Sequence, residues 1–458
     1  YCDKIGIIFM STVQDPVNFK LLKKIGIKAI KVGSDDFDNI LNLEYYAKKK
    51  LPMIISRGMS GIKEIKNIIN KIYKINKKLA VLHCISIYPS LPEELNLKQI
   101  LKKRILNFGP LSISDFILEA NLNSRFGYYN NNFPFGKKGD YITSPEISQM
   151  FGELLALWTI DYWKKIREPK KFNIIELGPG SGILMIDFLR VIKLYPKFIE
   201  KCNQIFLFEI SPFLKKIQKK NLSKIENKIL EKIKWIKNLN DIPEIPFVLI
   251  ANEFFDALPI KQIQLTEIGW RERMLNYNKD KKSFFISYPN NPTILENFLP
   301  KNKKYRKIGS IYEIPFNMIS FLENLFNKIK KTKSTCLIID YAKNKKFKNS
   351  LKSIKNQKII NPLKEIGNSD ISTHVNFDLI KKTSTKFNLN SHGPVSQRQF
   401  LIELGILYRT KTLIKNANSK QRKKIKKGLD FLINKEKMGK IFNVISISNK
   451  KINNLIGF

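Results

Sequence analysis

One short stretch of the sequence constrains the fold more than any other. In residues 174–182 an apolar run ends in Glu176, and glycines follow at alternate positions, Gly178, Gly180 and Gly182. Residues 183–194 continue with helical spacing. This order predicts a buried strand, a tight turn and the start of a helix. Glycine lets the backbone turn sharply and approach a ligand, and the free amides of a helix start face that ligand. The stretch therefore predicts a nucleotide-type cofactor site.

The next predicted strand supplies a second acid. Residues 204–209 form an apolar run that ends in Glu209, the position at which doubly wound folds hold a ribose through its hydroxyls. The distance from the glycines exceeds the roughly 20 residues of a dinucleotide site, which a long helix over residues 183–194 would explain. Because the phosphate-binding spacing of glycines is absent, the two strand-end carboxylates suit a ligand with a ribose and no phosphates. S-adenosyl-L-methionine is the commonest such ligand, and its sulfonium favours nearby negative charge.

The net charge does not point to a particular partner. Lys and Arg number 82 against 39 acidic residues, a net charge of +43, which ordinarily suggests nucleic acid or an anionic surface. Here lysine is spread over the whole chain with abundant Ile and Asn, as in proteins from AT-rich genomes, and no basic stripe interleaved with aromatics stands out. We therefore expect no specific nucleic-acid partner. No apolar run approaches the roughly 18 residues of a membrane span, so no membrane insertion is expected.

Cysteine and histidine are too sparse for a metal or disulfide framework. The four cysteines stand far apart with no C-x-x-C pair, and the chain has three histidines. We expect no metal site, no disulfide scaffold and a reducing compartment. A chain of 458 residues has room for two or three domains, each with its own core.

The first hundred residues repeat a strand-helix rhythm. Short apolar strands are predicted at residues 5–9, 29–32, 53–55 and 79–82. Four such units are half of an eight-fold barrel. Small hydroxyls and a lysine lie at or near the strand ends, at Thr12, Lys31, Ser34 and Ser56. Such side chains at the carboxyl ends of barrel strands suit a phosphate site.

This segment, residues 1–100, resembles the middle of the sialic acid synthase family, barrel enzymes that condense phosphoenolpyruvate with an N-acetylated sugar. The resemblance includes the H-C-x-S-x-Y-P pattern of residues 83–89. On the family's pattern the four residues named above would hold phosphoenolpyruvate. The family's first strands, its later segments with the metal-binding histidines and its C-terminal antifreeze-like domain are absent from this sequence. We therefore predict a partial TIM barrel of four βα units without catalytic activity.

A longer set of segments carries a second resemblance. They are residues 127–129, 140–153, 176–182, 209–212, 251–259, 270–273, 338–341, 370–377, 393–400 and 438–439. Together they make the chain, from about residue 105 to its end, similar to the MidA family of methyltransferases, whose mitochondrial members act in assembly of respiratory complex I. The resemblance implies a class I methyltransferase fold in residues 101–458, a Rossmann-like doubly wound α/β sheet. The cofactor core would span about 170–345 and an inserted substrate-side region about 260–330.

The family's pattern also assigns the S-adenosyl-L-methionine site. The residues it implies are Thr143, Ser144, Pro145, Glu146, Glu176, Gly178, Pro179, Gly180, Gly182 and Glu209. The first four belong to a polar loop in residues 139–153 that could act as a lid over the site. The same loop also reads as a plain capped helix start with Pro145 at its first position.

Catalytic candidates follow the predicted fourth strand. In class I methyltransferases the end of this strand faces the sulfonium methyl, and here residues 247–256 run from an apolar strand into Asn252, Glu253 and Asp256. These three are the candidates, with Glu272 as a further acid. The alternative is that both aromatic residues between them, at 254 and 255, belong to the core and that Glu253 is exposed.

Three further elements complete the prediction. Residues 336–341 read as the fifth strand, which contains Asp340, and residues 442–448 as the last strand. Residues 393–400 are predicted to begin a helix that runs to Leu404. His374 would either face the substrate or serve as a structural residue.

The resemblance further implies that the chain methylates an arginine of the complex I 49-kDa subunit, giving symmetric dimethylarginine, in a bacterial cytoplasm or a mitochondrial matrix. Carboxylates suit this protein substrate, since a guanidinium keeps its proton and can be held bidentately. Three alternatives remain: an assembly factor that binds the cofactor without catalysis, a methyltransferase for another substrate, and a sugar-acid synthase. The sequence does not set the oligomeric state.

Overall fold

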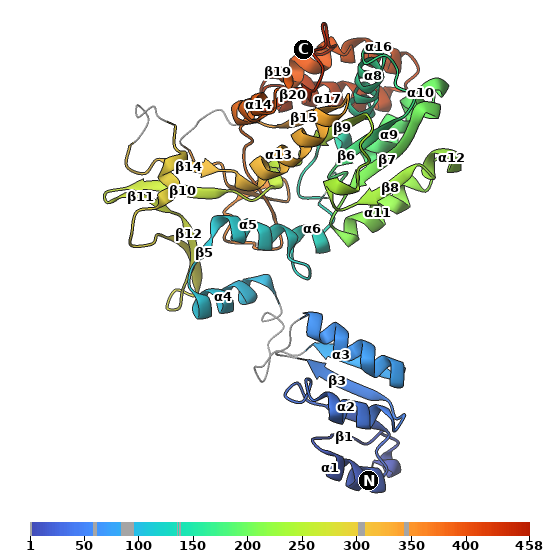
Figure 1. Ribbon diagram of the computed structural model, residues 1–458, viewed down its shortest axis with the longest axis vertical. Coiled ribbons are helices and arrows are strands. Elements are labelled where there is room, and N and C mark those ends of the chain that lie inside the picture. Colours follow the sequence, from blue (N-terminus) through green and yellow to red (C-terminus); the bar gives the residue numbers. More distant parts are fainter. Residues whose placement is uncertain are drawn as a thin grey trace. The chain divides into compact units, whose positions relative to one another are not determined.

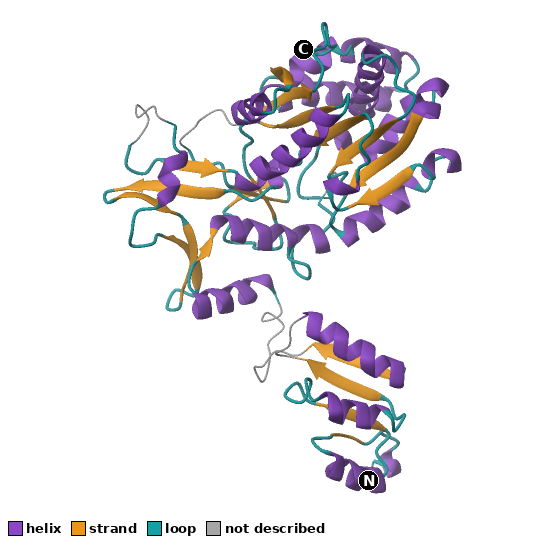
Figure 2. Cartoon of the chain, viewed as in Figure 1, coloured by secondary structure: helices purple, strands orange, loops and turns teal. Residues whose placement is uncertain are grey.

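The computed structural model describes residues 2–57, 62–83, 96–134, 136, 139–300, 307–342 and 348–458. The chain forms two compact units, Tyr1–Gln99 and Ile100–Phe458. Each has a hydrophobic core of its own, and both combine helices with sheets (Figures 1 and 2).

The N-terminal unit contains a parallel sheet whose four strands pair in chain order. The strands are β1 (Met10–Thr12), β2 (Ala29–Val32), β3 (Met53–Arg57) and β4 (Leu79–His83), and the helices are α1 (Pro16–Ile25), α2 (Ile40–Ala47) and α3 (Ile62–Ile75). Apolar side chains from both kinds of element, including Phe19, Ile30 and Tyr46, form one buried core. The predicted strand-helix rhythm is present in this unit.

The first strand lies later than predicted. Residues 5–9 were expected to form it, but β1 begins at Met10, and Ile5, Ile7 and Ile8 are exposed. Register explains the shift, because Met10 to Thr12 pair with the first three residues of β2. Backbone pairing with the neighbouring strand decides the position here, and local hydrophobicity does not.

The C-terminal unit is built on a seven-stranded sheet with the order β19-β20-β15-β9-β6-β7-β8. The strands are β6 (Phe172–Leu177), β7 (Cys202–Phe208), β8 (Ile233–Ile236), β9 (Phe247–Asn252), β15 (Thr335–Tyr341), β19 (Asn390–Ser396) and β20 (Phe442–Ser448). All are parallel except β20, which runs antiparallel to both of its neighbours. The chain places β7 and then β8 on one side of β6, and it then returns to pair β9 with the other side of β6. Such a reversal of strand order creates the crevice in which doubly wound folds bind ligands.

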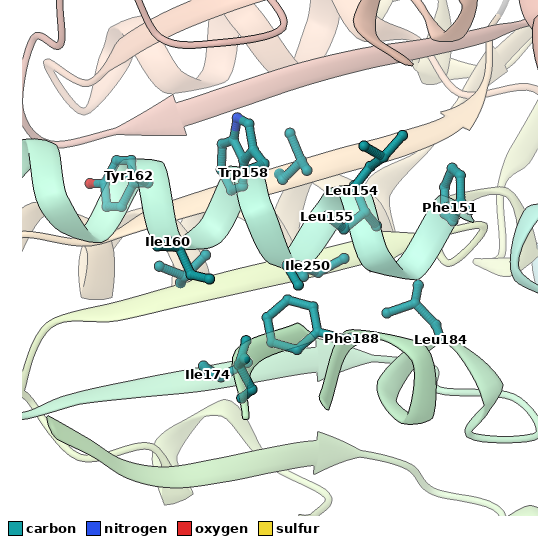
Figure 3. Close-up of a cluster of buried hydrophobic side chains, with 14 of the residues drawn as sticks. Phe151, Leu154, Leu155, Trp158, Ile160, Tyr162, Ile174, Leu184, Phe188 and Ile250 are labelled. Carbon is teal, nitrogen blue, oxygen red and sulfur yellow. The ribbon is translucent and has the colours of Figure 1, made fainter. Parts of the chain in front are cut away.

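Helices cover both faces of this sheet, so neighbouring residues of a strand face different cores. Along β6, Ile174 packs in a core with α8 (Gln149–Lys165) and α9 (Ile183–Ile192), as Figure 3 shows. Ile175 packs in the opposite core with α13 (Phe316–Lys331) and α14 (Phe377–Lys386). Because parallel strands are buried on both faces, they read as continuous apolar runs, which is why the sequence locates them well.

The remaining helices lie around this core and in the segment that leads to it. They are α4 (Leu97–Phe108), α5 (Ile113–Leu122), α6 (Tyr128–Asn131), α7 (Ser144–Ile147), α10 (Pro196–Lys201), α11 (Pro212–Leu222), α12 (Asn227–Leu230), α15 (Gln397–Glu403), α16 (Ile406–Lys415), α17 (Ser419–Ile433) and α18 (Met438–Ile441). The long helix predicted for residues 183–194 is shorter, and α9 and α10 together account for the distance between β6 and β7.

Three small antiparallel sheets interrupt the doubly wound pattern. Their strands are β5 (Leu111–Ser112), β10 (Lys261–Thr266), β11 (Gly269–Glu272), β12 (Met274–Asn278), β13 (Ser283–Ser287), β14 (Ile311–Ile314), β16 (Lys352–Lys355), β17 (Lys358–Ile360) and β18 (Asp370–Ser372). Strands β10 to β14 occupy most of the inserted region that was predicted for about residues 260–330.

One predicted helix begins within its predicted segment, residues 393–400, but not at the first residue of that segment. Residues 393–396 belong to β19, and α15 begins only at Gln397. Pairing with β20 holds this segment extended, since His392 lies opposite Ser446 and Val395 opposite Val444. Among the described residues, no helix combines the length and the apolar character of a membrane span.

Candidate active site

Polar side chains converge at the carboxyl edge of the seven-stranded sheet. Glu176 lies near the end of β6, Glu209 directly follows β7, Asn252 ends β9 and Asp340 lies near the end of β15. Parallel strands end at one edge, so these four strands deliver their polar residues to the same side of the sheet. The sequence identified each of these strand ends.

The glycine loop after β6 has the conformation that glycine permits. Gly178 and Gly180 have φ angles of 59° and 55°, in the left-handed region that side chains disfavour. A Cβ atom on Gly178 would also lie 3.1 Å from the ring of Phe254. The loop leads into α9, whose N-cap residue, Gly182, offers no side-chain cap. The first amides of α9 are therefore left for another acceptor, as in other nucleotide-type sites.

Glu209 is held by a buried network that the sequence did not reveal. Its Oε1 accepts a hydrogen bond from the Ser211 amide (2.8 Å) and its Oε2 from Gln218 Nε2 (3.0 Å). Gln218 also donates to the carbonyl of Gly180 (2.9 Å) and accepts from the Trp235 indole (2.8 Å). Burial raises the pKa of Glu209, and its hydrogen bonds oppose that rise. Gln218 thus ties the second-strand acid to the glycine loop.

The polar loop that leads into α8, with residues 143–146, contacts the glycine loop and the end of β9. The Ser144 amide donates to Glu253 Oε1 (3.2 Å), and the Ser181 hydroxyl donates to Glu146 Oε1 (2.6 Å). Thr143 and Pro145 lie beside them and are also buried. The structure therefore brings all four predicted residues of this loop against the glycine loop and the end of β9.

These elements enclose a cavity of about 50 Å³. Its lining includes Thr143, Pro145, Glu146, Glu176, Gly178, Pro179, Gly180, Asn252 and Glu253. A second pocket, of about 550 Å³, lies between this loop and α9, α16 and α17, and Pro145, Glu146 and Ile183 line both. Drug-sized ligands occupy roughly 300–1,000 Å³. The smaller space alone is therefore too small for a nucleoside-sized cofactor, and the larger pocket adjoins it through the shared lining residues.

Glu176 faces this cavity with an unused acceptor. The side chain is buried and its Oε2 has no hydrogen-bond partner. Burial raises the pKa of this carboxyl to about 8. An orphaned acceptor in a cavity wall fits a ligand that brings donors, such as the ammonium and hydroxyl groups of S-adenosyl-L-methionine.

Four carboxyl groups form what we call the carboxyl cluster: Glu253, Asp256, Asp340 and Asp370. Burial, followed by repulsion from Asp256, raises the pKa of Glu253 to about 8. Burial also raises the pKa of Asp340 to about 7 and that of Asp370 to about 6. The pKa of Asp256 rises through burial and through the charges of Asp340 and Asp370. Burial and mutual repulsion therefore favour protons on part of this cluster near neutral pH.

Backbone geometry fixes the cluster. Glu253 adopts a left-handed φ of 51°, and its amide donates to the carbonyl of Ile339 on β15 (2.9 Å). Asp340 Oδ2 accepts from the amides of Phe255 (2.9 Å) and Asp256 (3.3 Å). Asp370 Oδ1 accepts from the Tyr129 hydroxyl (2.6 Å). Glu253 is thus not the exposed side chain of the alternative interpretation, although Phe255 does belong to the core.

The two remaining candidates from the sequence, Glu272 and His374, are not members of the carboxyl cluster. Glu272, on β11, forms an ion pair with Lys261 (2.9 Å). The ring of His374 lies parallel to that of Tyr341 with centroids 6.4 Å apart. Among the described residues no group of His, Cys, Asp and Glu side chains is arranged to hold a metal ion.

In the N-terminal unit, the four predicted phosphate-site residues lie on or just after neighbouring strands. Thr12 pairs in register with Lys31, Ser34 follows β2, and Ser56 lies on β3. Ser56 is buried without a hydrogen-bond partner for its hydroxyl. Most of the 83–89 segment, from residue 84 on, lies outside the described residues.

Comparison with known proteins agrees with this geometry. Residues 154–395 match the profile of a family of S-adenosyl-L-methionine-dependent methyltransferases. The chain belongs to this family. It is 32% identical over 374 residues to the zebrafish (Danio rerio) protein arginine methyltransferase NDUFAF7, mitochondrial, covering 77% of this chain and 87% of the relative. The human protein of that name is 31% identical over 366 residues, with coverage of 75% and 81%.

A solved structure shows the same fold. A methyltransferase-superfamily protein from Burkholderia thailandensis, bound to S-adenosyl-homocysteine, superposes with a TM-score of 0.70 at 20% identity. The match covers 79% of this chain and 93% of that protein. This likeness confirms the class I methyltransferase fold. The matched family profile confirms S-adenosyl-L-methionine as the cofactor. Residues 1–109 match the profile of the NeuB family, in agreement with the sialic acid synthase resemblance.

The buried acid of β6 generates a stability prediction. Because folding raises the pKa of Glu176 to about 8, the folded chain holds a proton that the unfolded chain has lost above about pH 5. Stability contributed by this proton is complete below the unfolded pKa and is lost as the pH rises toward 8. Glu176→Gln removes this titration. Between pH 5 and 8, the free energy of unfolding of this variant, measured by urea titration, should fall by about 3–4 kcal/mol less than that of the parent.

The exposed turn residue Glu267 provides the control. Glu267→Gln should follow the parent across the same pH range. If Glu176→Gln did so too, Glu176 would be ionised in the folded chain and the burial argument would be wrong.

Proposed function

We propose that this chain methylates arginine in a protein substrate. The observation that carries the proposal is the carboxyl cluster at the end of β9, beside the residues assigned to the cofactor. The methyltransferase family supplies the reaction class, and the arginine substrate is taken from the names of the relatives. A guanidinium stays protonated at ordinary pH and presents planar donors that match carboxylates.

The proposed substrate is the 49-kDa subunit of respiratory complex I, with symmetric dimethylarginine as the product. This choice follows from the sequence resemblance to the methyltransferase family that acts in complex I assembly. Because the relatives are mitochondrial, the protein would act in the mitochondrial matrix of a eukaryote, or in the cytoplasm of a bacterium. Methylation would then support assembly of complex I. We further propose that the small sheets around β10 to β14 face this substrate.

S-adenosyl-L-methionine supplies an electrophilic methyl group. Thr143, Ser144, Pro145, Glu146, Glu176, Gly178, Pro179, Gly180, Gly182 and Glu209 are the residues proposed to hold it. Glu209 would accept hydrogen bonds from ribose hydroxyls, since each of its oxygens has a further lone pair beside the hydrogen bond it already accepts. The amides that follow the glycine loop would bind the polar tail of the cofactor.

Asn252, Glu253 and Asp256 are the residues proposed to handle the guanidinium. An arriving cation lowers the pKa of nearby carboxyls, so Glu253 and Asp256 would give up protons and grip the guanidinium as carboxylates. Their grip would fix the orientation of one nitrogen and keep positive charge on the others. The neighbouring carboxyls offer sites for the proton that methylated arginine must lose.

Glu253→Gln tests this assignment. The amide oxygen can still accept from Ser144 and Asn252, so binding of S-adenosyl-homocysteine, measured by calorimetry, should stay within about twofold of the parent. Loss of the carboxylate should lower the rate of dimethylarginine formation, followed by mass spectrometry of the 49-kDa subunit, by about 100-fold or more.

Glu226→Gln is the matched control, since that acid is exposed and pairs with Lys193 (3.6 Å), and it should leave the rate unchanged. Normal turnover by Glu253→Gln would remove Glu253 from the mechanism. Cofactor binding by the parent without methyl incorporation into any lysate protein would favour the non-catalytic assembly factor. Incorporation into a different protein would favour another substrate.

For the N-terminal unit we propose a partial barrel without synthase activity. The buried Ser56 hydroxyl supports this, because a phosphate could not reach it. The purified chain should therefore release no phosphate from phosphoenolpyruvate in the presence of N-acetylmannosamine and a divalent metal. Condensation of these two substrates would overturn the proposal and restore the sugar-acid synthase alternative.

A further inference from the structure

Lys352, on β16, places a cation on the aromatic ring of Tyr341. Its Nζ lies 3.7 Å from the ring centroid, well within the range of a cation–π interaction. The ring also packs against two other rings, that of Phe442 at 4.1 Å and the nearly parallel ring of His374 at 6.4 Å between centroids. Tyr341 therefore forms a fixed aromatic surface that does not depend on Lys352 for its orientation.

The residue that carries this aromatic surface adjoins the carboxyl cluster, since the Tyr341 amide donates a hydrogen bond to Asp340 Oδ1 (2.8 Å). After burial, the four charges that raise the pKa of the Tyr341 phenol are those of Glu253, Asp256, Asp340 and Asp370. Lys352 acts in the opposite direction, since its charge lowers the pKa of Glu253, Asp256 and Asp370. Strand pairing fixes its place, because Lys352 lies opposite Ser372, two residues after Asp370. The ammonium is thus an internal counter-ion of the cluster.

An acceptor beside the cluster has no donor. Asn252 is 9% exposed, and its Nδ2 donates to Glu253 Oε1 (3.2 Å), which fixes the orientation of the amide. Its Oδ1 has no hydrogen-bond partner. The Lys352 ammonium, drawn to the ring of Tyr341, does not satisfy this oxygen. A guanidinium could lie flat on an aromatic ring and still direct coplanar N–H groups at a carboxylate and an amide oxygen.

We propose that Lys352 occupies the position of the substrate's arginine: its ammonium covers the Tyr341 ring on which the guanidinium stacks, and it leaves when the substrate enters. This inference rests on the proposed function, which it extends by naming Tyr341 as the surface that selects a planar cation. Lys352 then keeps the acidic site neutralised while no substrate is bound. The substrate must displace an internal cation, so cations that cannot stack on Tyr341 are selected against.

The test measures binding and does not require turnover. N-acetyl-arginine amide is titrated by calorimetry into the full chain saturated with S-adenosyl-homocysteine. Lys352→Met keeps an unbranched stem and removes the competing charge, so the variant should bind this probe roughly tenfold more tightly than the parent. N-acetyl-lysine amide should gain less, because an ammonium cannot stack.

Two further variants locate the effect. Lys355→Met, on the same strand, removes a lysine that pairs with Glu365 (2.8 Å) and should leave the affinity at the parent's value. Adding Tyr341→Leu to Lys352→Met should abolish the gain, while binding of S-adenosyl-homocysteine shows that the variant is folded. Unchanged or weaker binding by Lys352→Met, or a gain that survives Tyr341→Leu, would overturn the inference.

Failure of the proposed function would look different. If Lys352→Met tightens binding of the arginine probe while the parent methylates no arginine, the cation site stands and the assignment of the reaction falls. If the parent methylates arginine and Lys352→Met leaves probe binding unchanged, the reaction stands and the role of Lys352 falls. If neither protein binds the probe, the inference is overturned whatever the activity.

Discussion

The burial of carboxyl groups at one edge of a parallel sheet is the constraint on which the rest of the site depends. Parallel strands β6, β7, β9 and β15 all end at this edge, so acids that are far apart in the sequence become neighbours. Removal from water raises the free energy of each ionised carboxyl, and repulsion between neighbouring carboxylates raises it further. The fold meets this cost by keeping protons on Glu176 and Glu253, and by donating backbone amides to Asp340.

This arrangement suits chemistry on cations. In the proposed mechanism Lys352 offsets part of the charge of this site and competes with the substrate. Offsetting every carboxylate charge in this way would need further counter-ions and would increase that competition. A site of protonated carboxyls can instead become negative when a cation arrives, at the cost of releasing protons. The loop of residues 139–153 also contacts these acids. The Ser144 amide donates a hydrogen bond to Glu253, and Glu146 of the loop accepts one from the Ser181 hydroxyl.

The sequence predicts the strands that carry the site better than the contacts within it. Strands buried on both faces read as apolar runs, so β9 and β20 lie within the predicted bounds. Elements whose position depends on backbone pairing with a neighbouring strand cannot be located from hydrophobicity alone. The late start of β1 and the extended residues 393–396 are examples. Gln218 lies in a lysine-rich helix without any local sign of its contacts with Glu209, Gly180 and Trp235. Lys352 joins the site through a small sheet about 100 residues after β9, which no spacing rule reveals.

The central claim is that these buried acids hold protons and release them when a cation enters. It is tested most directly by comparing S-adenosyl-L-methionine with S-adenosyl-homocysteine, which differ by a methyl group and the sulfonium charge. Each is titrated at pH 7 into the full chain in buffers of different ionisation enthalpy, which reports the number of protons released on binding. The account predicts that the sulfonium ligand releases more protons than the neutral thioether. Equal release by both ligands would mean that the acids are already ionised or lie too far from the bound cation, and would contradict the account.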